Sequence, residues 1–218
     1  MKIPENIKAV IFDVDGVIID SEPTWIKSHD EFFGKHNVIL SEDEKSSLRG
    51  IGLKQLIIRL HKDFNLQKSV DDLLAEYREI FYKNFSGSGD MKAVEGVEEV
   101  VKYFYNNGLR LAIATGGHSV SEMEKMLTQF NLLKYFEVIV SGDEVEKGKP
   151  DPDVFLLAAE KLKAKPSECL VIEDSINGVT AGKAAGMVVW GVNKNPAVYD
   201  NLKKTGVDEV YYSFKELL

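Results

Sequence analysis

The chain has 218 residues, of which 44% are hydrophobic and 28% are charged, an ordinary composition for a globular protein with one large domain or two smaller ones. Its formal net charge of −8 argues against a general nucleic-acid surface, and no segment has the ~18 apolar residues that cross a bilayer. A single cysteine, Cys169, excludes an internal disulfide, and the N-terminal residues lack a signal-peptide pattern. We therefore expect a cytoplasmic protein with neither nucleic acid nor a membrane as partner. A monomer is compatible with the sequence, which leaves the oligomeric state open.

The first third of the chain contains one strand pattern followed by helical patterns. A short apolar run over residues 8–12 predicts a buried strand that stops at Asp13. From there to about residue 88 the spacing of apolar residues is helical, and helices are expected at 25–36, 41–48, 53–63 and 69–84. Residues 20–88 therefore form a helical insertion after the first strand.

Strand and helix patterns alternate in the rest of the chain. A helix at 94–107 should end at Gly108, where the chain needs a left-handed residue. Strands are then expected at 110–114, 137–140, 169–172, 187–191 and 209–212, and helices at 121–130, 153–162 and 177–185. Such alternation predicts right-handed crossovers and an α/β fold with a parallel sheet covered by helices on both faces. The core would consist of residues 1–19 and 89–218.

Polar side chains gather where the predicted strands end. They lie in four short segments, at residues 13–16, 115–117, 148–152 and 173–175. Because ligands bind at the carboxyl ends of the strands in such sheets, four carboxylates, one hydroxyl and one lysine should meet at one edge. Each residue alone has an ordinary explanation as a turn, cap or surface residue, but their joint placement indicates a site.

The residue types of this group suit phosphoryl transfer. Clustered carboxylates repel one another unless a cation is present, and oxygen ligands without histidine or cysteine suit Mg²⁺. An aspartate can attack phosphorus and form an aspartyl phosphate. Thr115, Lys149 and nearby backbone N–H groups can hold the phosphoryl oxygens, and Gly116 lets the backbone approach closely. Ser119 and Glu122 have capping-box spacing, so this loop should open a helix whose N-terminus favours an anion.

Four motifs carry a family resemblance that covers nearly the whole chain. Asp13-Val-Asp15-Gly16-Val17, Ala114-Thr115-Gly116, Gly148-Lys149-Pro150-Asp151-Pro152 and Ile172-Glu173-Asp174-Ser175 resemble, in order, the four motifs of the haloacid dehalogenase (HAD) superfamily. The resemblance implies a Rossmann-like core with a small α-helical cap domain, here residues 20–88, that closes over the site. The most similar group holds β-phosphoglucomutase and the sugar-phosphate phosphatases. A small phosphorylated metabolite would be the partner.

The resemblance also implies a role for each matching residue. Asp13 would be the nucleophile and a Mg²⁺ ligand. Asp15 would protonate the leaving oxygen, then deprotonate the attacking water, and ligate the metal through its backbone carbonyl. The remaining roles are phosphoryl binding, by Thr115, Gly116 and Lys149, and metal binding, by Asp174 and, directly or through water, Glu173. Haloacid dehalogenases themselves resemble the chain less, because they lack the second acid that an alkoxide leaving group requires.

Two alternatives to a sugar-phosphate phosphatase stay open. A β-phosphoglucomutase type is disfavoured, because Trp25 and Leu53 stand where the resembling mutases carry a cap histidine and arginine. The chain also has Gly117-His118-Ser119 where the mutases have a Ser/Lys-rich loop. A receiver-like phospho-signalling domain would share the aspartate, threonine, lysine and Mg²⁺, but would have neither the helical insertion nor an acid placed like Asp15.

Several residues near the expected site keep two interpretations. Either His118 contacts the substrate, or it is only the residue at which a helix begins. Trp25 lines the pocket or, as we expect, packs between cap and core. The cap cations Arg49, Lys54 and Arg78 meet the tail of the substrate or point into water.

Overall fold

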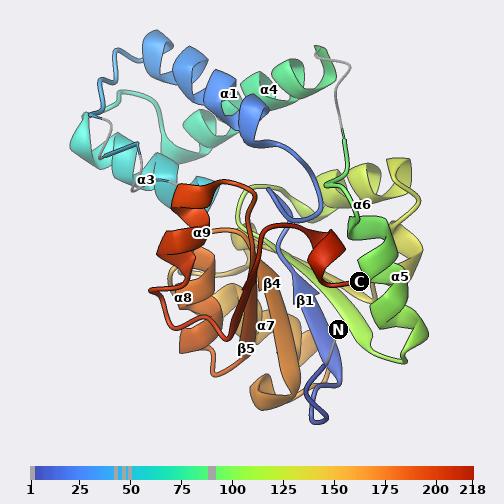
Figure 1. Ribbon diagram of the computed structural model, residues 1–218. Coiled ribbons are helices and arrows are strands. Elements are labelled where there is room, and N and C mark those ends of the chain that lie inside the picture. The colour runs from blue at the N-terminus through green and yellow to red at the C-terminus, as the bar shows by residue number, and fades with distance from the viewer. Residues whose placement is uncertain (1–2, 42–43, 46–47, 49–50, 88–91) are drawn as a thin grey trace.

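The computed structural model describes residues 3–41, 44–45, 48, 51–87 and 92–218. Within them, a helical layer lies above a parallel sheet that is flanked by helices (Figure 1). Half of the residues of the helix expected at 41–48 fall outside the described residues. The cation Arg49 also falls outside them. None of the described helices is both long enough and apolar enough to span a membrane.

The sheet has six parallel strands in the order β3-β2-β1-β4-β5-β6. Their bounds are β1 Ala9–Phe12, β2 Arg110–Thr115, β3 Val138–Ser141, β4 Cys169–Glu173, β5 Val188–Val192 and β6 Glu209–Tyr211. The chain order reverses between β1 and β4, which lie side by side. In an open α/β sheet the crevice outside the strand ends at this point is where ligands bind.

Helices cover both faces of the sheet. They are α5 Val97–Asn106, α6 Val120–Gln129, α7 Asp153–Lys161, α8 Ile176–Ala184 and the short α9 Pro196–Leu202. Side chains of β1 alternate between the two faces: Phe12 packs edge-on against Phe104 of α5, with ring centroids 5.9 Å apart, whereas Ile11 belongs to the cluster that contains Phe155 of α7. The apolar run of β1 is therefore buried on both sides, as a central parallel strand requires.

The segment between β1 and α5 forms the helical layer. Its helices are α1 Glu22–Lys35, α3 Leu53–Asp63 and α4 Val70–Gly87, and α1 packs along α4 (Figure 1). Phe32 of α1 and Tyr77 and Phe81 of α4 are buried in their interface. In the described part of this segment no strand joins the sheet. Its boundaries as a separate domain, at residues 19/20 and 88/89, stay a prediction.

The α/β fold class predicted from the sequence is confirmed, and two details differ. Thr115 and Glu173, expected just after their strands, are the last residues of β2 and β4, where they are in register with Ser141 and Gly191. Helix α9 was not expected, although Asn195 caps it by accepting a hydrogen bond from the N–H of Ala197 and Pro196 begins it. Seven residues are too few to show a helical period in the sequence.

Candidate active site

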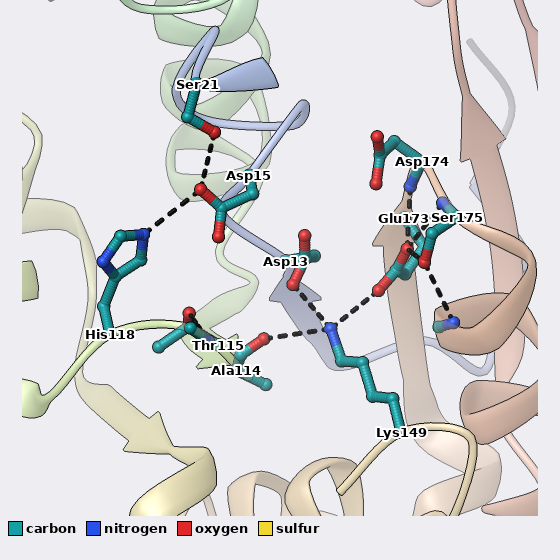
Figure 2. Close-up of polar contacts among 12 residues, drawn as sticks. Asp13, Asp15, Ser21, Ala114, Thr115, His118, Lys149, Glu173, Asp174 and Ser175 are labelled. Carbon is teal, nitrogen blue, oxygen red and sulfur yellow. Dashed lines mark hydrogen bonds and ion pairs between the residues drawn. The ribbon is translucent and has the colours of Figure 1, made fainter. Parts of the chain in front are cut away.

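Asp13, Lys149 and Glu173 form a buried ionic group at the carboxyl ends of β1 and β4. The Lys149 ammonium donates to Asp13 Oδ1 at 2.5 Å and to Glu173 Oε1 at 2.7 Å, so it bridges the two carboxylates (Figure 2). All three side chains are less than 10% exposed. Asp13 follows β1 directly, and its N–H donates to the carbonyl of Ile172 in β4. The sheet therefore fixes the first carboxylate beside the second.

The second oxygen of Glu173 is also occupied. Oε2 accepts hydrogen bonds from the backbone N–H groups of Asp174 and Ser175 at 2.9 Å each, and from the Ser175 hydroxyl at 3.0 Å. That hydroxyl also accepts from the N–H of Gly178 and so caps α8. Both oxygens of Glu173 thus have partners within the protein, and its main contact in the site is Lys149.

Asp174 completes a cluster of carboxylates. One oxygen each of Asp13, Glu173 and Asp174 lies within 4.8 Å of the others. Burial raises the pKa of Asp13, and the charges of Glu173 and Asp15 add to that effect against the opposing attraction of Lys149. Burial likewise raises the pKa of Asp174 well above its usual range, and repulsion from Glu173 and Asp13 adds to it. The positive charge of Lys149 is therefore not enough to compensate the negative charge of these carboxyl groups.

This cluster fits a hard divalent cation. The donors are carboxylate oxygens without histidine or cysteine, which is the set that Mg²⁺ prefers. A cation among them would relieve the repulsion that raises both pKa values. Because both oxygens of Glu173 are already bonded, Asp13 and Asp174 are the side chains best placed to hold it. Room for Asp174 comes from Gly16, where an added Cβ would lie 2.3 Å from Asp174 Oδ2.

Asp15 turns away from this cluster. Its Oδ1 accepts from the Ser21 hydroxyl at 2.6 Å, from Trp25 Nε1 at 2.7 Å and from His118 Nε2 at 3.1 Å, and Figure 2 shows the first and the last of these bonds. Burial by itself would raise the pKa of Asp15, but the charge and hydrogen bond of His118, with the bonds from Ser21 and Trp25, outweigh burial and lower it. Asp15 is therefore ionised in this arrangement.

The loop after β2 lies beside Asp13. Thr115 is fully buried at the end of the strand, and its hydroxyl accepts from the N–H of Gly117 at 3.2 Å. The carbonyl of Ala114 accepts weakly from Lys149 at 3.4 Å (Figure 2). The Gly116 carbonyl accepts from the N–H of Leu53, the first residue of α3. This loop thus joins the core site to the helical layer.

The expected capping box before α6 is present, and in it the N–H of Ser119 donates to the Glu122 carboxylate at 2.7 Å. Of the cap cations, Arg78 forms an ion pair with Asp143 of the core at 2.6 Å. Lys54 is half-buried in α3. Arg78 therefore contacts the core through Nη2 instead of pointing only into water.

The structure brings together Asp13, Asp15, Thr115, Gly116, Lys149, Glu173 and Asp174, as the sequence predicts, and adds residues that the sequence analysis did not assign to the site. Ser21 and Trp25 both bond Asp15, which their spacing from it did not reveal. Trp25 does pack between cap and core, against Phe81 and His118, with ring centroids at 4.4 and 5.7 Å. The ring contacts of Trp25 with Phe81 and His118 join segments distant in sequence, so no local motif encodes them.

Comparison with known proteins agrees with the geometry. Residues 10–192 match the family model of the haloacid dehalogenase-like hydrolases. The chain is 32% identical over 187 residues to a phosphorylated carbohydrates phosphatase of Thermotoga maritima, covering 85% of each chain. It is 30% identical over 210 residues to hexitol phosphatase A of Escherichia coli, covering 96% of this chain and 93% of the relative.

A solved structure resembles the whole chain. CbbY from Rhodobacter sphaeroides, in complex with phosphate, superimposes with a TM-score of 0.79 at 27% identity, over 97% of this chain and 96% of CbbY. The matched family model spans the four motifs and strands β2 to β5, with nearly all of β1, and the relatives share most of the chain length. The chain therefore belongs to the haloacid dehalogenase superfamily and is an enzyme of its phosphatase group.

Proposed function

We propose that the protein is a Mg²⁺-dependent phosphomonoester hydrolase that acts on a small sugar phosphate through an aspartyl-phosphate intermediate on Asp13. The observation that carries the proposal is the contrast between two aspartates on one loop. Asp13 is buried against Lys149 and the carboxylate cluster, whereas Asp15 is held apart, with Oδ1 in three hydrogen bonds. This contrast supports a nucleophilic role for Asp13 and an acid–base role for Asp15.

The first half of the reaction transfers the phosphoryl group to Asp13. A carboxylate oxygen of Asp13 forms a bond to phosphorus while the bond from phosphorus to the sugar oxygen breaks. The electron pair of the broken bond stays on the sugar oxygen, which takes a proton from Asp15 and leaves as an alcohol. Asp15, a carboxylate in the free site, takes up this proton from solvent when the phosphate dianion binds. Lys149, the Thr115 hydroxyl and the backbone N–H groups of this loop hold the phosphoryl oxygens.

The second half releases phosphate. Asp15, now a carboxylate, takes a proton from a water molecule as the water oxygen bonds to phosphorus. The bond between phosphorus and Asp13 breaks, and its electron pair restores the Asp13 carboxylate. When bound at Asp13 and Asp174, with Glu173 and the backbone carbonyl of Asp15 nearby, Mg²⁺ supplies the positive charge that offsets the repulsion between carboxylate and phosphoryl group.

The substrate class rests on the relatives. The two curated relatives compared above are named for phosphorylated carbohydrates and for hexitol phosphates, and both match this chain over most of its length. A receiver-like signalling domain is disfavoured by Asp15, since a domain that stores the phosphoryl group gains nothing from a second acid that activates water.

Turnover of p-nitrophenyl phosphate with Mg²⁺ tests the proposed activity, and a panel of sugar, nucleoside and glycolytic phosphates tests the substrate class. Release of inorganic phosphate, fastest from a sugar or sugar-alcohol phosphate, is expected. If no phosphomonoester is hydrolysed although the purified chain is folded, the proposal is wrong. If nucleoside phosphates are preferred, the proposed reaction is still supported, but the proposed substrate class is wrong.

The mutase alternative is tested separately. With β-glucose 1-phosphate and a trace of the 1,6-bisphosphate, we expect slow or no release of phosphate and little glucose 6-phosphate, because Trp25 and Leu53 stand where the mutases carry a histidine and an arginine. Rapid formation of glucose 6-phosphate without phosphate release would establish a mutase instead.

A further inference from the structure

His118 is a core residue buried beneath the helical layer. It lies on the loop between β2 and α6, and its side chain is 1% exposed. Its ring packs against Trp25 of α1 and Phe81 of α4, with centroids 5.7 and 5.3 Å away. A hydrogen bond fixes the backbone of this loop, because the backbone carbonyl of His118 accepts from the Ser141 hydroxyl at 2.6 Å. A polar ring in such surroundings costs stability unless its nitrogens are bonded.

Both nitrogens of His118 have partners. Nδ1 lies 3.1 Å from the hydroxyl of Tyr82 in α4, and Nε2 lies 3.1 Å from Asp15 Oδ1. An ionised carboxylate can only accept, so Nε2 carries a hydrogen and donates it. The ring therefore reaches from a cap tyrosine to the aspartate that the proposed reaction uses as acid and base.

The donors around Asp15 separate its two oxygens. Among the described residues, Ser21, Trp25 and His118 all donate to Oδ1. Oδ2 lies on the side of the phosphoryl-binding loop, because a Cβ built on Gly117 would be 3.2 Å from it. Three donors on one oxygen fix the rotation of the carboxyl group and leave Oδ2 for the proton. Ser21 and Trp25 approach from the start of the helical layer, whereas His118 approaches from the core.

We propose that His118 is a positioning residue that holds Asp15 by Oδ1, so that Oδ2 delivers the proton to the leaving oxygen. The proposal rests on the proposed phosphatase function and adds to it a residue outside the four motifs. A general acid works only within hydrogen-bond reach of the atom that it protonates, and a displacement of about 1 Å can cost about 100-fold in rate.

The dependence of rate on the leaving group reports this role. For a series of aryl and alkyl phosphates, kcat/KM covers the steps up to departure of the alcohol and so excludes hydrolysis of the aspartyl phosphate. A p-nitrophenolate leaves without a proton, but an alkoxide does not. Loss of a well-placed acid therefore lowers kcat/KM most for the alkyl esters and steepens the plot of log kcat/KM against leaving-group pKa.

The variants His118→Gln and His118→Asn form the sharpest pair. Glutamine can place its amide nitrogen near the position of Nε2, whereas asparagine is too short, and both are polar and neutral. His118→Leu also lacks the donor but suits the apolar surroundings, in case a buried amide disturbs the fold. His61→Asn, on a half-buried histidine of α3, is the matched control, and the thermal midpoint of each variant is measured.

We expect His118→Asn and His118→Leu to lower kcat/KM at least about 10-fold for alkyl phosphates and less than about 3-fold for p-nitrophenyl phosphate. His118→Gln should regain most of the loss, and His61→Asn should match the wild type. Equal losses for all leaving groups, or a glutamine variant as impaired as the asparagine one, would overturn the positioning role and leave the phosphatase function standing. A folded wild type that hydrolyses no phosphomonoester would overturn both.

Discussion

Gly178 is in such close contact with Glu173 that a Cβ built on the glycine would lie 1.7 Å from Glu173 Oε1. That oxygen is the one that accepts from Lys149. A helix residue five positions downstream thus provides the space that lets a carboxylate hold the site lysine, and only glycine leaves enough room for it.

Gly178→Ala should therefore damage the site. The new methyl group must displace the Glu173 carboxylate, and Lys149 loses one of its two anionic partners. We expect a free energy of unfolding lower by about 1–3 kcal/mol, as for overpacked cores, and a kcat at least about 10-fold lower because Lys149 shifts. Urea denaturation and steady-state kinetics measure the two effects.

A control for that variant is Gly34→Ala in α1. Nothing lies within 4 Å of a Cβ added there, so alanine should be tolerated or should stabilise the helix by about 0.5–1 kcal/mol. Wild-type kcat in Gly178→Ala would show that Glu173 does not need its present position to support turnover.

Asp13→Asn should abolish nearly all turnover while the fold is kept. The amide has the size of the carboxylate, but it lacks the charge that attacks phosphorus. Rapid acid quench after mixing with a labelled substrate should trap a phosphoenzyme in the wild type and none in the variant. Asp20→Asn, which removes an exposed partner of Lys194, is the matched control and should stay active. Turnover of Asp13→Asn at the wild-type rate would exclude the aspartyl-phosphate mechanism.

Mg²⁺ should stabilise the protein as well as activate it. Binding to the folded state alone adds about 2.7 kcal/mol when the ion is present at 100 times its Kd, and the thermal midpoint should rise accordingly. Asp174→Asn should lose most of this rise. Without metal, this variant should be as stable as the wild type or more so, because burial and repulsion from Glu173 and Asp13 raise the pKa of Asp174.

The matched control for the metal is Asp151→Asn, on an exposed residue of the loop that carries Lys149. It should keep the full Mg²⁺-induced rise in thermal midpoint. Chelation should abolish turnover, and Ca²⁺ should fail to restore it because its larger, looser coordination misplaces the nucleophile. Full activity after exhaustive chelation would contradict the metal requirement.

His29 should make the helical layer sensitive to acid. Burial lowers its pKa to about 4, against an ordinary value of 6.5, and Nδ1 lies 2.6 Å from the Tyr77 hydroxyl. Because the folded-state pKa lies below that of the unfolded chain, the unfolded state binds more protons between these values. Stability is therefore full above about pH 6.5 and falls as the pH drops toward 4.

His29→Asn tests this sign, since the amide oxygen can replace Nδ1 as acceptor but does not titrate. Between pH 6.5 and 4, protonation of this group should lower the free energy of unfolding of the wild type by up to about 3 kcal/mol, at 1.36 kcal/mol per pKa unit. Contact of the ring with water makes this loss smaller. Urea denaturation at several pH values should show a smaller loss in the variant. Parallel curves for both proteins would mean that His29 does not titrate in this range.

The sequence by itself determined the order of elements and the chemistry of the strand ends. Buried apolar runs such as that of β1 and the alternation after residue 89 predict a parallel sheet, because local periodicity and right-handed crossovers leave few other arrangements. Asp13, Asp15, Lys149 and Asp174 could be found because each follows a predicted strand within a recognisable motif. Helix α9 was missed because seven residues hold too little periodic information.

The tertiary structure decided which of these side chains act together. Glu173, expected as a weaker candidate than Asp174 for metal binding, has both oxygens bonded within the protein and accepts a hydrogen bond from Lys149. Asp15 receives donors from Ser21, Trp25 and His118, and His118 stands 103 residues away in the chain. A motif shows which residues lie near the end of a strand, because the local backbone geometry fixes their position. Packing of the helical layer on the core selects rotamers and partners across long separations, and no local pattern encodes that selection.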